Sequence, residues 1–182
     1  MRVVLDACVL YPTVMREILL GVAATGAFTP LWSERILEEW ARAVAAKLPD
    51  QEGVARAEIA LLKMRWPDAV VSSDPQLEDR LHLPDINDRH VLASAIAGRA
   101  DALVTQNLSD FPTRVLATHN VLRRDPDGFL LGIWQDDPKG VTAVCGAVQS
   151  KAAEISGVPQ PLRPLLKKAR LPRLAKALEN QG

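Results

Sequence analysis

Val3-Val4-Leu5-Asp6 joins a short apolar run directly to an acidic residue. Three consecutive apolar residues rich in β-branched side chains are typical of a central strand that is buried on both faces of a parallel sheet. Asp6 follows at the position where this strand is expected to end. Because a carboxylate beside a buried strand loses hydration unless another group compensates it, Asp6 is the acid hardest to explain as a surface charge.

Outward from this segment, short apolar stretches alternate with helical patterns. The periodicity predicts helices over about 12–24, 33–47, 51–65 and 88–97. The apolar runs predict further strands over about 28–32, 69–71, 102–105 and 120–123. Alternation of this kind is the signature of βαβ units, so we expect residues 1–130 to form an α/β sandwich with a parallel sheet.

The strand pattern stops near Asp136, and a helical segment followed by several prolines predicts a small helical subdomain over 136–182. The chain has 22 basic and 22 acidic residues, a net charge of zero. Residues 150–182 hold seven basic and two acidic side chains, a net charge of +5, so the remainder carries −5. The neutral total therefore conceals an acidic domain and a basic C-terminal region, and the basic region suits phosphate or an acidic partner.

The two cysteines, Cys8 and Cys145, are far apart and have no metal-ligand spacing, so neither a disulfide framework nor a zinc site is expected. The longest uncharged stretch, 18–33, contains two glycines and a proline and is shorter than the ~20 apolar residues of a membrane span. We therefore expect a soluble cytoplasmic protein that does not associate with membranes.

Acidic or amide residues recur where the predicted strands end or helices begin. The positions are Asp6, Glu38, Glu39, Asp85, Asp88, Asn107 and Asp110. In an open parallel sheet, ligands bind at the carboxyl ends of the strands. Several carboxylates at one edge repel each other unless a cation lies among them, so the pattern indicates a hard divalent metal such as Mg²⁺ or Mn²⁺, which suits phosphoryl chemistry.

Each of these acids also has a purely structural interpretation. Asp85 and Asp88 stand at a helix start, where backbone capping and the helix dipole alone favour acids. Asp110 is equally suited to capping a turn. Glu38 and Glu39 both lie outside the apolar stripe of their helix, so periodicity does not separate them.

Other catalytic signatures are absent or weak in the sequence. His90 lies two residues past Asp88 and is expected on the helix surface or beside the site, not as a catalytic base. Neither a glycine-rich phosphate loop nor a G-x-S-x-G elbow occurs. A haloacid-dehalogenase-like phosphatase also begins with a strand-end Asp, but it requires a second Asp at the position that Cys8 occupies.

Four segments together resemble a PIN domain, and most of all the VapC-like toxin ribonucleases of type II toxin–antitoxin systems in a branch with an extra C-terminal helical region. These segments are 4–12, 32–40, 83–93 and 103–112. The resemblance implies a PIN-like three-layer sandwich around a central parallel sheet, followed by a small C-terminal helical subdomain.

The resemblance also assigns roles to individual residues. The catalytic acids that it implies are Asp6, Glu39, Asp88 and Asp110, of which Asp6, Asp88 and Asp110 are the metal ligands for Mg²⁺ or Mn²⁺. The auxiliary residues that it implies are Asp85, Thr105 and Asn107. Two positions depart from the family pattern: position 8 is Cys where Asn, Ser or Thr is commoner, and position 107 is Asn where many members have Asp.

The activity implied is metal-dependent hydrolysis of RNA phosphodiesters by the toxin of a toxin–antitoxin pair. Its expected partners are an RNA substrate, a cognate antitoxin protein and a second copy of the chain in a homodimer. Candidate RNA contacts are Arg89, Arg99, Arg123, Arg124, Lys167 and Lys168. The alternative is a PIN-type module that binds RNA or protein without catalysis, which a metal titration distinguishes.

Overall fold

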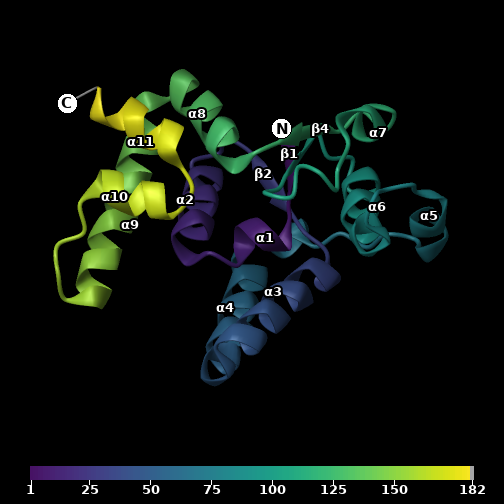
Figure 1. The fold of residues 1–182 in the computed structure, drawn as a ribbon, viewed down its shortest axis with the longest axis horizontal. Helices are drawn as coiled ribbons and strands as arrows, with labels where there is room; N and C mark the ends of the chain where they lie inside the picture. Colours follow the sequence, from purple (N-terminus) through teal and green to yellow (C-terminus); the bar gives the residue numbers. More distant parts are fainter. Residues whose placement is uncertain (181–182) are drawn as a thin grey trace. The chain divides into compact units, whose positions relative to one another are not determined.

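The computed structural model describes residues 1–180 and contains one four-stranded parallel sheet (Figure 1). The strands are β1 (Arg2–Leu5), β2 (Thr29–Leu31), β3 (Ala102–Val104) and β4 (Leu122–Arg124), in the order β2-β1-β3-β4. Residues 181–182, the end of the predicted C-terminal subdomain, lie outside the described residues. Helices flank the sheet, so the predicted α/β fold with a central parallel sheet is confirmed.

The Val3-Val4-Leu5 run occupies the centre of this sheet. Val4 pairs with Leu31 of β2 on one side and with Leu103 of β3 on the other. All three residues of the run have no exposed surface. Burial on both faces explains why the run is continuously apolar instead of alternating.

The four helices predicted from periodicity are confirmed. They are α2 (Thr13–Ala24), α3 (Glu34–Lys47), α4 (Glu52–Arg65) and α6 (Arg89–Ala97). Ser33 caps α3, because its Oγ accepts a hydrogen bond from the Ile36 N–H at 3.2 Å. Figure 1 shows α3 and α4 side by side. No helix within residues 1–180 combines the length and the apolarity needed to cross a membrane.

The strand predicted over 69–71 is wrong, because this segment forms only a single bridge between Trp32 and Val70. Its partner strand has no residues left to extend the pairing, since the chain turns into the N-cap of α3 directly after Trp32. Four helices of 4 to 11 residues were not predicted. They are α1 (Ala7–Leu10), α5 (Pro75–Arg80), α7 (Thr113–Ala117) and α8 (Pro126–Asp136).

The described residues form two compact units. The first contains Met1–Tyr11 with Thr29–Arg124, and therefore the sheet; the second contains Pro12–Phe28 with the chain from Asp125 onward. The second unit is helical: α2 packs on α9 (Pro138–Ser156), and α8 packs on α11 (Pro172–Glu179), which follows α10 (Leu162–Lys168). Whether 1–130 and 136–182 fold as separate domains stays a prediction.

Replacing the cap of α3 tests how much this helix start contributes to stability. We expect Ser33→Ala to lower the free energy of unfolding by about 1 kcal/mol, because the Ile36 N–H loses its acceptor in a buried setting. Urea unfolding followed by circular dichroism measures the change. Ser72→Ala, at an exposed serine of the same unit, is the control, and equal effects of the two substitutions would contradict the capping role.

Candidate active site

The sheet register places Asp6 beside Thr105. Leu5 pairs with Val104, so the next residues of β1 and β3 emerge together at the carboxyl edge. Asp6 is only 5% exposed, and its N–H donates to the Val104 carbonyl at 3.1 Å. Thr105, fully buried, donates its hydroxyl to Asp6 Oδ2 at 2.6 Å. The central acid is therefore fixed from the neighbouring strand.

Cys8 is a second donor to the same carboxylate. Its Sγ lies 3.1 Å from Asp6 Oδ2 and accepts the N–H of Gln106 at 3.2 Å. Burial, and then the charge of Asp6, raise the pKa of the Cys8 thiol to about 12, so it keeps the proton that it donates. Cysteine thus makes a hydrogen bond to Asp6 at the position where Asn, Ser or Thr is commoner among PIN-like sequences.

The charged form of the Asp6 carboxylate is destabilised by burial in spite of these donors. Burial raises its pKa above the usual value of 3.8, while the hydrogen bonds from Thr105 and Cys8 lower it and the charge of Glu39 raises it. A buried anion is stable only where charge or hydrogen bonding compensates its lost hydration. The environment of Asp6 therefore favours an added positive charge.

Asp85 and Asp88 have different local roles. Asp85 is exposed and caps a 3₁₀ turn, accepting from the N–H and the side-chain amide of Asn87 at 2.8 and 2.9 Å. Asp88 is half-buried and precedes α6, but its side chain makes no capping hydrogen bond. The capping interpretation therefore accounts for Asp85 and leaves the Asp88 carboxylate available for another purpose.

Glu38 and Glu39 also point to different surroundings. Glu38 pairs with Arg56 at 2.9 Å and with Arg42 at 3.1 Å, and these arginines hold its pKa below the usual range. Glu39 Oε1 lies 2.8 Å from Nε2 of His90. The structure thus separates two neighbours that helical periodicity leaves equivalent: Glu38 belongs to a surface ion-pair network, and Glu39 faces the α6 side.

His90 is buried, so its expected place on the helix surface is wrong, whereas the other expectation, a place beside the site, agrees with its contact to Glu39. The residue is 1% exposed. Among the described residues neither ring nitrogen has a hydrogen-bond partner, so the approach of Nε2 to Glu39 is close in distance without hydrogen-bond geometry. Sequence reasoning missed this contact, because spacing from Asp88 carries no information on what α3 brings to α6.

The loop after β3 supplies the remaining polar groups. The N–H of Asn107 donates to the Thr105 hydroxyl at 3.0 Å, and Asp110, partly buried, accepts from the Ser109 hydroxyl at 3.2 Å. Arg123 donates to the carbonyl of Phe111 at 3.1 Å and to that of Leu108. One end of the Arg123 side chain thus holds the loop that carries Asp110.

The negative charges of the neighbouring acids affect the pKa of Asp88. Burial, and then the charges of Asp6, Asp85, Asp110 and Glu39, raise the pKa of Asp88 to about 6. All of these groups offer carboxylate oxygens, the donors that hard divalent cations prefer. Within residues 1–180, however, no three His, Cys, Asp or Glu side chains lie close enough together to hold a metal ion. The carboxylates are therefore chemically suited to Mg²⁺ or Mn²⁺, but their side chains do not form a complete metal site in this structure.

The basic residues predicted to contact RNA have varied surroundings. Arg99, Arg124, Lys167 and Lys168 are exposed, and Arg89 is partly buried with an Nε that has no partner among the described residues. In the second unit, Arg163 pairs with Glu179 at 2.6 Å and Arg173 with Asp127 at 3.1 Å. Part of the positive charge of the C-terminal region is therefore neutralised locally.

Comparison with known families identifies the fold. Residues 2–109, more than half of the chain, match the model described as "PIN domain". The chain belongs to the PIN-domain family. This domain match includes Asp6, Glu39 and Asp88 and ends one residue before Asp110.

A shorter match is to a named relative. A stretch of 44 residues is 48% identical to the Mycobacterium tuberculosis (strain ATCC 25618 / H37Rv) protein named "Putative ribonuclease VapC50". The match covers 24% of this chain and 26% of that protein, so it spans about a quarter of the relative's length. No solved structure matches the chain. The PIN-domain assignment thus rests on the family model, and the likeness to a VapC protein is local.

Removing the Asp88 charge is expected to stabilise the metal-free PIN domain. The folded protein disfavours the Asp88 carboxylate, so stability is lost as the pH rises from about 4 to about 6. Asp88→Asn should therefore raise the free energy of unfolding by roughly 1 kcal/mol at pH 8 in EDTA, allowing for solvent screening at a half-exposed group. The gain should shrink at pH 4.5.

Urea unfolding at the two pH values measures this effect. Asp79→Asn, at an exposed acid on α5, is the matched control and should change stability little at either pH. A loss of stability in the Asp88→Asn variant at pH 8 would show that this carboxylate is not under electrostatic strain.

Proposed function

We propose that this chain is a metal-dependent endoribonuclease and the toxin of a toxin–antitoxin pair. The PIN domain and the ribonuclease name of the similar protein support a nuclease. The observation that carries the proposal is the buried Asp6 carboxylate, held by Thr105 and Cys8 at the sheet edge, with further acids acting on Asp88. Such an arrangement costs stability without a cation and is therefore expected to serve catalysis.

Asp6, Asp88 and Asp110 would hold Mg²⁺ or Mn²⁺, with Glu39 as the fourth catalytic acid. When bound, such an ion lowers the pKa of a coordinated water and stabilises the charge that develops on the phosphoryl oxygens. The protein's own contribution is positional. Thr105 and Cys8 fix Asp6, and Glu39 lies against His90. Asp85 and Asn107 are auxiliary, since one caps the turn before Asp88 and the other donates to Thr105.

RNA is the proposed substrate, and its flanking phosphates require cationic contacts. Exposed side chains suited to this role are Arg99, Arg124, Lys167 and Lys168, with Arg89 beside Asp88. Arg123 is occupied by loop carbonyls and would act by holding the Asp110 loop. A cognate antitoxin would cover the acidic edge, and a second copy of the chain is a further expected partner. Both free thiols suit the reducing cytoplasm.

The neighbouring pair Glu38 and Glu39 gives a sharp test of catalysis. Purified protein should cut RNA in Mn²⁺ or Mg²⁺ and stop in EDTA. Glu39→Gln and Asp6→Asn should each lower the cleavage rate on the order of 100-fold or more, since metal charge stabilisation is worth several kcal/mol. Glu38→Gln, which removes only surface ion pairs with Arg42 and Arg56, should cut at nearly the normal rate.

A gel assay of a labelled RNA under single-turnover conditions measures these rates. Equal cutting by wild type and Asp6→Asn, or undiminished cutting in EDTA, overturns the proposed mechanism. Tight RNA binding without cleavage, together with no metal binding in a calorimetric titration, would instead identify the chain as a non-catalytic PIN module.

The toxin role predicts an effect on growing bacteria. Induced expression of the chain should arrest growth, and the Asp6→Asn variant expressed at the same level should not. Co-expression of a small DNA-binding protein encoded next to the chain's own reading frame should restore growth. Arrest by the Asp6→Asn variant as strong as that by wild type would contradict toxicity through RNA cleavage.

A further inference from the structure

A hollow of about 410 Å³ lies outside the acidic edge, in the same unit as the sheet. It is lined by Arg80, Leu81, His82, Arg114, Val115, Thr118 and His119. Arg80 is the last residue of α5, and Leu81 and His82 follow it directly. The other four residues belong to α7 and to the turn after it. Its surface combines aliphatic side chains with two imidazole rings and two arginines, and none of the described carboxylates lines it.

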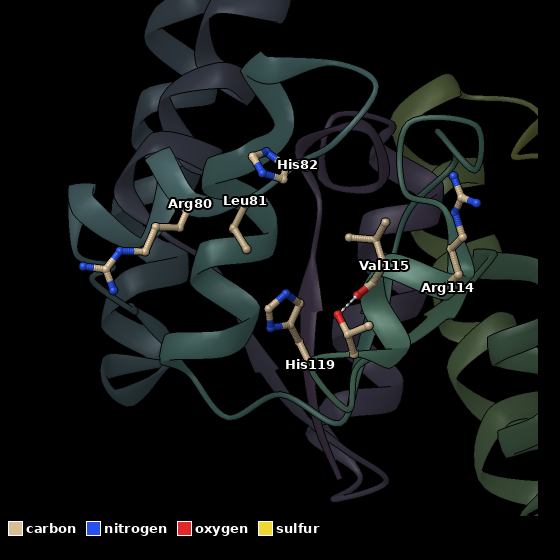
Figure 2. Close-up of a pocket in the computed structure, with 7 residues that line it drawn as sticks. Arg80, Leu81, His82, Arg114, Val115 and His119 are labelled. Atoms are coloured by element: carbon tan, nitrogen blue, oxygen red, sulfur yellow. Dashed lines mark hydrogen bonds between the residues drawn. The ribbon is translucent and has the colours of Figure 1, made fainter.

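Figure 2 shows how these side chains are arranged. Leu81 and Val115 face one another across the hollow, and the rings of His82 and His119 lie on its other two sides. The guanidinium groups of Arg80 and Arg114 point outward from it. The centre is thus flanked by apolar and aromatic groups and the rim by cations. The hydroxyl of Thr118 is already bonded to the Val115 carbonyl at 2.7 Å.

The two rim arginines carry positive charges that no carboxylate of the described residues neutralises. Within residues 1–180, neither Arg80 nor Arg114 is ion-paired with a carboxylate, although both are exposed. Arg35 and Arg56, by contrast, pair with Glu78 and Glu38. Unpaired cations around an apolar hollow are suited to an anionic ligand with a flat apolar part.

The chain connectivity keeps this hollow near the candidate active site. Arg80 precedes Asp85 by five residues, so their Cα atoms lie at most ~18 Å apart even in an extended chain. Arg114 follows Asp110 by four residues, which limits that separation to ~14 Å. Both walls are therefore continuous with segments that carry candidate acids, within the reach of a few nucleotides.

We propose that the hollow binds one unpaired base of a single-stranded RNA, while Arg80 and Arg114 contact the phosphates on either side of it. The inference rests on the proposed function for its substrate class. Unstacked bases bind on aromatic or histidine rings and apolar side chains, and arginines hold the backbone. A base inside a duplex is not free to enter, so the hollow selects unpaired RNA at a fixed distance from the cut.

Binding measured without cleavage tests this site. A fluorescein-labelled single-stranded 12-mer is titrated with the full chain in EDTA, and fluorescence anisotropy gives the Kd. We expect His82→Ala/His119→Ala to weaken binding roughly five- to 100-fold, the range for loss of base stacking. His82→Phe/His119→Phe, which keeps two aromatic rings, should bind within about twofold of wild type.

The contribution of the arginines is measured by the salt dependence of binding, because this dependence reflects the number of phosphates that the protein neutralises. Arg80→Ala/Arg114→Ala should reduce the slope of log K against log salt by ~1.4, or ~0.7 for each single-strand phosphate that the variant no longer neutralises. Arg65→Ala, at an exposed arginine of α4 beyond the hollow, is the matched control and should leave the slope unchanged. Circular dichroism verifies that each variant is folded.

Cleavage of the same RNA in Mn²⁺ is measured in parallel, so the two proposals fail separately. An unchanged Kd in both the histidine and the arginine double variants overturns the base site, whatever the cleavage result. Equal weakening with a fully duplex RNA also overturns it. Weaker binding by the variants, together with no cleavage by wild type, supports the base site and overturns the nuclease.

Discussion

The structure depends on one buried carboxylate at the end of the central strand. Asp6 is fixed by the register of β1 against β3, which brings the Thr105 hydroxyl within 2.6 Å of its Oδ2. A residue in this position cannot turn to solvent, because the strand that it follows is buried on both faces. Its charge is compensated only in part by Thr105 and Cys8, so the fold retains an electrostatic cost that an added positive charge would reduce.

Neighbouring acids in this chain differ because their side chains have different partners in the fold. Glu38 and Glu39 are adjacent on one helix, yet two arginines hold the first and a buried histidine lies against the second. Asp85 closes a turn with its own side chain, and Asp88, three residues later, makes no cap and has a raised pKa. The members of each pair look alike in the sequence, and the contacts that each side chain makes in the fold distinguish them.

This contrast explains what the sequence could and could not predict. The Val3-Val4-Leu5 run and the helical periodicities predicted the sheet core and four helices, because burial and amphipathicity determine the pattern of apolar residues along a short segment. The bridge at Val70, the burial of His90 and the hydrogen bond from Cys8 depend on packing between distant segments. The acids were found at strand ends and in the first turns of helices, but their catalytic roles stay predictions, as does the division into 1–130 and 136–182.

The most direct test of the central claim is where a paramagnetic ion binds. Mn²⁺ added in small amounts to ¹⁵N-labelled protein broadens amide signals near its site. The account predicts selective loss of the signals around Asp6, Asp88 and Asp110. Broadening confined to other acidic surfaces, or no broadening at all, would contradict a metal-binding site built around Asp6.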